Sequence, residues 1–150
     1  MAAQGHALDF VGSGRNGPMS DPDNEGHSGW RIDQIASIAD SVLAQYRPNV
    51  ITLEIGTNDL NGNYQVPTAP DRMSALIDQI LKAAPDATVL VGTVIVSTSP
   101  TEEAYRPEFN QKLTQITESE GGSGCGTQGK KEGEQGRCCV DEQPAAQDGS

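Results

Sequence analysis

Apolar segments of two periodicities alternate along residues 7–119, and this alternation most limits what the chain can fold into. Three segments are β-branched or continuously apolar, as strands are, at 7–12, 50–55 and 88–96. Three others carry apolar residues at the spacing of one helix face, within 30–46, 73–84 and 109–116. This order predicts an α/β fold with a parallel sheet and right-handed crossovers. Because 88–96 is nearly all apolar, we expect both faces of that strand to be covered.

The composition changes near residue 120. Residues 121–150 hold nearly half of the 17 glycines and all 3 cysteines, but only one large aliphatic residue, Val140. We therefore predict a partial α/β domain over 1–120 and a disordered, Gly-rich, low-complexity tail over 121–150, which cannot offset the entropy of ordering itself. The cysteines lack the paired spacing of a zinc site and have no histidine nearby, so we expect no metal and no cofactor. These cysteines are Cys125, Cys138 and Cys139.

Charge and hydropathy exclude several classes of partner. The net charge of -11 would be repelled by phosphate backbones and anionic lipid, so we expect no nucleic-acid partner. No apolar run approaches the roughly 18 residues of a membrane span. The first residues show neither the basic start nor the apolar stretch of a signal peptide, and the sequence leaves localisation open.

The segment Gly56-Thr57-Asn58-Asp59 follows directly on an apolar strand, where open α/β sheets bind their ligands. Glycine there would let a substrate approach the backbone, and the asparagine amide could stabilise an oxyanion without losing a proton. The alternative is that Asn58 or Asp59 caps the turn or the next helix, and spacing alone favours that role.

A second segment, Gly26-His27-Ser28-Gly29-Trp30, stands at the entrance of the first helix, where a glycine N–H can point toward negative charge. Together the two segments resemble the SGNH hydrolase superfamily, the GDSL-type esterases and lipases, over about residues 4–119. The resemblance implies that Gly29 and Asn58 donate the two hydrogen bonds of an oxyanion hole, supported by Gly56 and Asp59. The residues at 9–13, 26–30 and 109–111 are similar to those of family members that act on acylated carbohydrates.

The resemblance also implies a three-layer, flavodoxin-like fold with strand order 2-1-3-4-5. In that order 7–12 is the second strand and 50–55 the third, and the first and last strands of the family are missing. The implied activity is hydrolysis of carboxylic or carbohydrate acyl esters, with a small-molecule or carbohydrate ester as the partner. Neighbours of a missing central strand would present unpaired backbone groups, which predicts a marginal, self-associating species.

The reactive residues of the family pattern are absent from the printed sequence, which contains neither Gly-Asp-Ser nor Asp-x-x-His. His27 is interpreted as a solvated or substrate-side loop residue. We reject a His27–Ser28 dyad because no orienting acid is identified and adjacent residues seldom reach the geometry. We expect a truncated esterase without activity, best explained by a truncated gene model and alternatively by a short paralogue. The other functional hypothesis is a non-catalytic remnant or saccharide-binding pseudoenzyme.

Two further residues have two interpretations each. Trp30, the only tryptophan, either lines a sugar or acyl site or packs as a staple at the helix start. Glu54 lies inside an apolar strand, where a carboxylate needs a partner. It either supports the Asn58 loop or faces outward.

Overall fold

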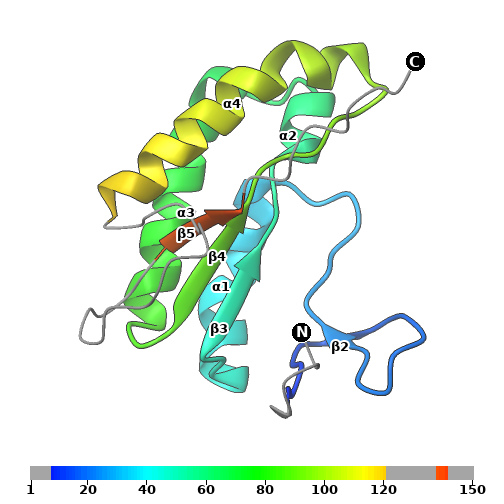
Figure 1. Ribbon diagram of the computed structural model, residues 1–150, viewed down its shortest axis with the longest axis vertical. Coiled ribbons are helices and arrows are strands. Elements are labelled where there is room, and N and C mark those ends of the chain that lie inside the picture. The colour runs from blue at the N-terminus through cyan, green and yellow to red at the C-terminus, as the bar shows by residue number, and fades with distance from the viewer. Residues whose placement is uncertain (1–7, 121–137, 142–150) are drawn as a thin grey trace.

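The computed structural model describes residues 8–120 and 138–141 of the chain. In chain order its elements are β1 (Gly14–Arg15), β2 (Asp23–Asn24), α1 (Ile32–Tyr46), β3 (Val50–Leu53), α2 (Thr57–Asn61), the 3-10 helix η1 (Val66–Thr68), α3 (Ala69–Ala83), β4 (Thr88–Gly92), α4 (Pro100–Ser119) and β5 (Cys138–Asp141) (Figure 1). The three predicted helices are present, and two of the three predicted strands are. The α/β fold class is confirmed.

The main sheet has the order β3-β4-β5 and all its strands are parallel. Val50 lies opposite Thr88, and Leu53 lies opposite Val91. The predicted strands at 50–55 and 88–96 are therefore neighbours, joined by the crossover through α3. The second of them ends early, at Gly92, and Ile95 and Val96 beyond it are more than half exposed.

Local signals explain where the long helices begin and end. Helix α1 starts after Arg31, whose N–H donates to the Gln34 side chain at 2.9 Å, and it ends at Arg47 in the left-handed conformation, just before Pro48. Helix α4 starts nine residues before its first predicted apolar position. Ser99 caps it by accepting the Glu102 N–H, and a proline occupies its first turn.

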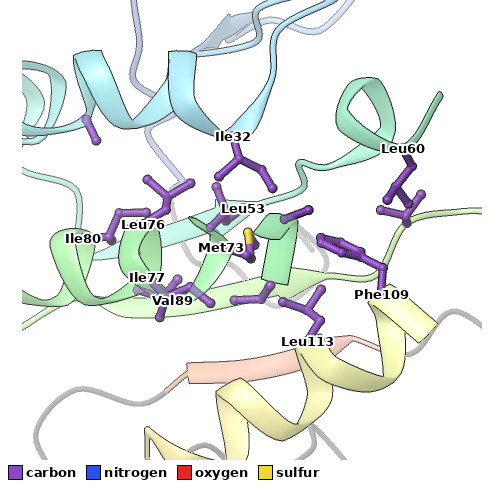
Figure 2. Packing of buried hydrophobic residues seen from close by; sticks show 14 of the residues in the cluster. Ile32, Leu53, Leu60, Met73, Leu76, Ile77, Ile80, Val89, Phe109 and Leu113 are labelled. Atoms are coloured by element: carbon purple, nitrogen blue, oxygen red, sulfur yellow. The ribbon is translucent and has the colours of Figure 1, made fainter. Parts of the chain in front are cut away.

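The core lies between one face of the sheet and the three long helices (Figure 2). Helix α3 sits in the middle and packs against both α1 and α4. Val89 and Val91 of β4 point into this core, whereas Leu90 between them is only half-buried. Buried side chains of this core include Ile32, Leu53, Met73, Leu76, Ile77, Val89, Val91, Phe109 and Leu113.

The expectation that 88–96 is covered on both faces is wrong for the described part of the chain, because its three long helices all pack on one face. Glu54 lies on the other face and is exposed, so the outward interpretation of this residue is the one that the structure supports. A side chain added at Gly92 would meet the Glu54 side chain at 3.5 Å, which places the two positions side by side on that open face.

The predicted strand at 7–12 is also wrong: residues 8–12 form no strand. The Phe10 N–H donates to the Asp21 carboxylate at 2.7 Å, and the Leu8 and Phe10 side chains are nearly half exposed. A local loop contact thus satisfies backbone that a sheet would otherwise have paired. The only strands among the described residues before α1 are β1 and β2, which pair antiparallel and have two residues each.

Strand β5 lies within the segment for which the sequence predicts no strand. Cys138–Asp141 pairs with the outer edge of β4, with Val140 opposite Val91. Such pairing joins backbone groups, so it needs little from the side-chain pattern. The remainder of the predicted tail, 121–137 and 142–150, lies outside the described residues, as does Cys125. Over residues 8–120 and 138–141, no helix combines the length and the apolar character that crossing a bilayer requires.

Candidate functional site

The two sequence segments singled out for chemistry meet at the start of α1. The Asn58 side chain, in the first turn of α2, donates from Nδ2 to the Trp30 carbonyl oxygen at 2.9 Å. Trp30 directly follows Gly29, so the side-chain amide of Asn58 is anchored one residue away from the backbone of Gly29. Because an amide nitrogen carries two protons, this bond leaves a second Asn58 N–H for another acceptor.

Gly29 stands at the open side of this junction. Its φ of +81° is a conformation that side-chain-bearing residues rarely adopt, and the turn around it is closed by the Trp30 N–H, which donates to the His27 carbonyl at 3.3 Å. A Cβ added at Gly29 would meet nothing within 4 Å. The glycine therefore serves the shape of the turn, and the space beside it is free for a ligand.

Gly56 is required by the packing of α2 against α4. It is buried with φ +124°, and a Cβ there would stand 2.9 Å from the Phe109 ring of α4. From the sequence, this glycine is expected to let a substrate approach the backbone. The structure instead fills the space with Phe109, so the glycine lets the first turn of α2 lie flat on α4.

Asp59 is fully buried and joins two helices that begin far apart in the sequence. One carboxylate oxygen accepts the Ile32 N–H at 3.1 Å, at the start of α1, and the other pairs with the Arg72 guanidinium in α3. Asp59 therefore does cap a helix, as the alternative reading held, but the helix is α1, 27 residues upstream.

Arg72 is a site residue that sequence reasoning missed. Its guanidinium also donates to the Tyr64 and Gln65 carbonyls, at 3.0 and 3.1 Å. The Tyr64 ring lies 4.1 Å from the Arg31 guanidinium and 5.2 Å from that of Arg72, which draws the starts of α1 and α3 together. A signal was present, because a carboxylate buried after a strand needs a cation and Arg72 is the only arginine between 48 and 105.

Glu25 is a second missed residue, and it organises the loop before α1. Its carboxylate accepts the Ser13 N–H at 2.8 Å and the Ser13 hydroxyl at 2.9 Å. The same carboxylate lies 2.7 Å from Nε2 of His27. Burial of the Glu25 carboxyl opposes ionisation, but the hydrogen bonds from Ser13 and His27 outweigh it and lower the pKa of Glu25 from its ordinary value.

His27 is a half-buried residue of the loop before α1, and its interpretation as a solvated or substrate-side loop residue stays a prediction. Its ring stacks on Trp30 with centroids 4.1 Å apart and planes 21° from parallel. Trp30 thus packs at the helix start, on a loop residue rather than on the helix. The acid that the sequence did not identify for His27 is Glu25, but Ser28 is exposed and makes no recorded contact with the imidazole.

A hollow of about 390 Å³ opens between η1 and α4. None of the four predicted site residues lines it, so it is separate from the junction of Gly29 and Asn58. Phe109 is the link between the two places, because it lines the hollow and also packs under Gly56. The other residues of its wall are Asn63, Val66, Pro67, Pro70, Tyr105, Glu108 and Lys112.

The fold places the chain among the α/β proteins with a parallel sheet, a class that generally binds ligands beyond the carboxyl ends of the strands. The family model of the GDSL-like lipase/acylhydrolase family matches residues 12–125. The chain belongs to this family, which confirms the resemblance to the SGNH hydrolases.

Solved structures agree with this assignment. A family 3 carbohydrate esterase of Clostridium thermocellum is 38% identical, with a TM-score of 0.69, over 79% of this chain and 57% of its own. A family 3 carbohydrate esterase of Talaromyces cellulolyticus is 24% identical, with a TM-score of 0.69, over 88% of this chain and 62% of its own, and shows the shared fold. An acetyl esterase mutant solved with an acetate ion aligns equally well. The chain thus spans less than two thirds of each relative's length. None of the curated proteins compared with the chain matches it.

Proposed function

We propose that the junction of α1 and α2 is the oxyanion-binding side of an ester hydrolase site, with the Gly29 N–H and the Asn58 amide as the donors. When a hydroxyl attacks an ester carbonyl, its proton passes to a base, a new C–O bond forms, and the C=O π bond opens so that the carbonyl oxygen takes the negative charge. Fixed N–H donors that meet this oxygen are each worth about 10²–10³ in rate. The observation that supports the proposal is the bond from Asn58 to the Trp30 carbonyl, since it fixes the amide beside Gly29.

Gly56 and Asp59 support the two donors from below. Because Gly56 has no side chain, the first turn of α2 packs directly on Phe109, and this contact determines the position of Asn58 in that turn. Asp59 binds the first N–H of α1, and so ties the helix that follows Gly29 to the helix that carries Asn58. Neither residue needs to touch a substrate to act in this way.

The substrate class that we propose is an acyl ester of a carbohydrate. The 38% identity to a protein described as a carbohydrate esterase supports it. The space beside Gly29 is open to a ligand, since an added methyl group there would meet no neighbour within 4 Å.

The printed sequence carries no Gly-Asp-Ser and no Asp-x-x-His, so we propose that these 150 residues alone do not turn over esters. The nucleophile and base of a triad act as a unit, and their loss leaves only a small residual rate. We expect no hydrolysis of p-nitrophenyl acetate above buffer and no labelling by a serine-reactive fluorophosphonate. Stoichiometric labelling that follows turnover would contradict this.

Acetate binding tests the donors themselves without requiring turnover. In a ¹⁵N-labelled sample of the chain, we expect acetate to shift the Gly29 amide and the Asn58 side-chain resonances, and the Asn58→Ala variant to weaken binding. An acetylated monosaccharide should shift the same resonances. If it alone binds, and Gly29 and Asn58 do not respond, the chain is a saccharide-binding pseudoenzyme without an oxyanion site. If neither ligand moves these resonances, the proposal is wrong.

A further inference from the structure

The loop that carries Gly29 is held by side chains to which the proposed reaction gives no role. Gly29 is the third residue of a four-residue turn, and the two end residues of that turn, His27 and Trp30, are joined by a backbone hydrogen bond of 3.3 Å. The same two residues stack their rings at 4.1 Å. Backbone and side chains therefore close the turn together, and its closure sets the direction of the Gly29 N–H.

The Asn58 donor depends on the same turn. Asn58 donates to the backbone carbonyl of Trp30, and the side-chain ring of the same Trp30 stacks on the His27 ring. If the turn tilts, that carbonyl moves, and the Asn58 amide moves with it. One turn thus positions both proposed donors. The orientation of the His27 ring determines how firmly this turn is held.

Glu25 holds the His27 ring in its orientation. Its carboxylate lies 2.7 Å from Nε2 of His27 and is itself fixed by two hydrogen bonds from Ser13, which is 12 residues upstream. Ser13 adjoins β1, and the pairing of β1 with β2 holds the segment just before Glu25. The carboxylate is therefore anchored to a second piece of chain, so it can restrain the imidazole.

We propose that Glu25 and His27 are positioning residues for ester hydrolysis, which act through Trp30 to hold the Gly29 N–H and the Asn58 amide on one oxyanion. The proposal rests on the proposed function of those two donors. Both side chains of the pair remain 23% exposed, and a contact between such exposed polar groups stabilises a fold little. Replacing His27 should therefore change the geometry of the donors more than the stability of the chain.

Two substitutions at His27 separate the parts of this device. His27→Phe keeps a ring to stack on Trp30 but loses the bond to Glu25, and His27→Ala loses both. The matched control is Glu108→Gln, which breaks a surface ion pair of 2.9 Å with Lys112 on α4. All variants are made in the full 150-residue chain and compared by thermal unfolding and by ¹H–¹⁵N spectra.

The first readout needs no ligand. We expect the Asn58 side-chain and Gly29 amide resonances to shift in His27→Phe, to shift further in His27→Ala, and to stay in place in Glu108→Gln. The second readout is acetate titration. We expect its Kd to rise about tenfold in His27→Ala, the factor expected when one of two charge-assisted hydrogen bonds is lost. The Kd in His27→Phe should be intermediate.

The outcomes are distinct. Unmoved Gly29 and Asn58 resonances in His27→Ala overturn the positioning role, whether or not acetate binds. Acetate that binds through both donors with equal Kd in all variants overturns it as well, and leaves the proposed function standing. Acetate that fails to perturb either donor in the unsubstituted chain refutes the proposed function and, with it, this inference. If His27→Ala unfolds, Glu25→Gln and His27→Phe answer the same question.

Discussion

Replacing Asp59 or Arg72 breaks the salt bridge between α2 and α3, whose carboxylate also accepts a hydrogen bond from the start of α1. The Asp59 side chain is completely buried, whereas that of Arg72 is 19% exposed. Removing one partner of a buried pair costs about 3–5 kcal/mol, because the other charge is left without compensation. A typical domain has only about 5–15 kcal/mol of stability in total. The loss is therefore large enough to be read directly from an unfolding curve.

The two single variants should differ. Asp59→Asn keeps an oxygen for the Ile32 N–H, and the arginine it leaves behind still donates to the Tyr64 and Gln65 carbonyls. We expect it to cost about 1–3 kcal/mol. Arg72→Met leaves a carboxylate with no exposure and no cation, so we expect about 3–5 kcal/mol. In the double variant the two costs should not add, with a coupling of about 1–3 kcal/mol.

Urea unfolding followed by far-UV circular dichroism measures these differences, with Glu108→Gln as the control. That substitution removes a pair in which Glu108 is 71% exposed, and it should stay within about 0.5 kcal/mol of the unsubstituted chain. The reasoning is refuted if Arg72→Met is no less stable than the control. It is equally refuted if the two single costs add fully, because the residues would then not act as a pair.

Three further predictions follow from individual residues. In the same urea assay, Gly56→Ala should lower the free energy of unfolding by at least about 2 kcal/mol, because both φ +124° and the Phe109 ring oppose a Cβ. Gly29→Ala should lower it by about 1–2 kcal/mol, because only its positive φ opposes a Cβ. The folded-state pKa of Glu25 lies below its ordinary value of 4.5, so its stabilisation is present above that value and is lost as the pH falls through the folded pKa. As the pH falls below 4.5, the chain should therefore lose more stability than Glu25→Gln does in the same urea assay. Val50→Lys should reduce self-association in sedimentation velocity, because β3 pairs only with β4 within the described residues and Val50 is 53% exposed; equal sedimentation would show that this edge is not the contact.

Helix periodicity carried most of what could be predicted about the fold. The apolar stripe ending before Pro48 located α1 almost to the residue, because that stripe is the face which packs on α3. The segment at 7–12 failed for the opposite reason. A run of six residues is stable as a strand only beside a partner, and in the structure the Phe10 N–H finds the Asp21 carboxylate instead.

The residues of the candidate site could be predicted where they directly follow a strand, and not where their contacts join residues far apart in the sequence. Gly29 and Asn58 were identified from their segments, and the structure brings those segments together. Arg72 and Glu25 were missed because nothing local distinguishes them: one lies in an ordinary first helical turn, and the other in a polar loop. Their importance comes from the buried carboxylate and the imidazole that they meet.

The contacts that hold the two proposed donors form a nearly closed set. Ser13, Glu25 and His27 fix the turn, and Asp59 with Arg72 fixes the two helix starts. Except for Phe109 beneath Gly56, every one of these residues lies between 13 and 72. The proposed oxyanion site therefore depends little on β5 or on the open face of the sheet. Within the described chain, the exposed edge of β3 and the contacts that hold the donors lie in different places. We therefore expect a chain that self-associates through that edge to keep the proposed anion site at Gly29 and Asn58.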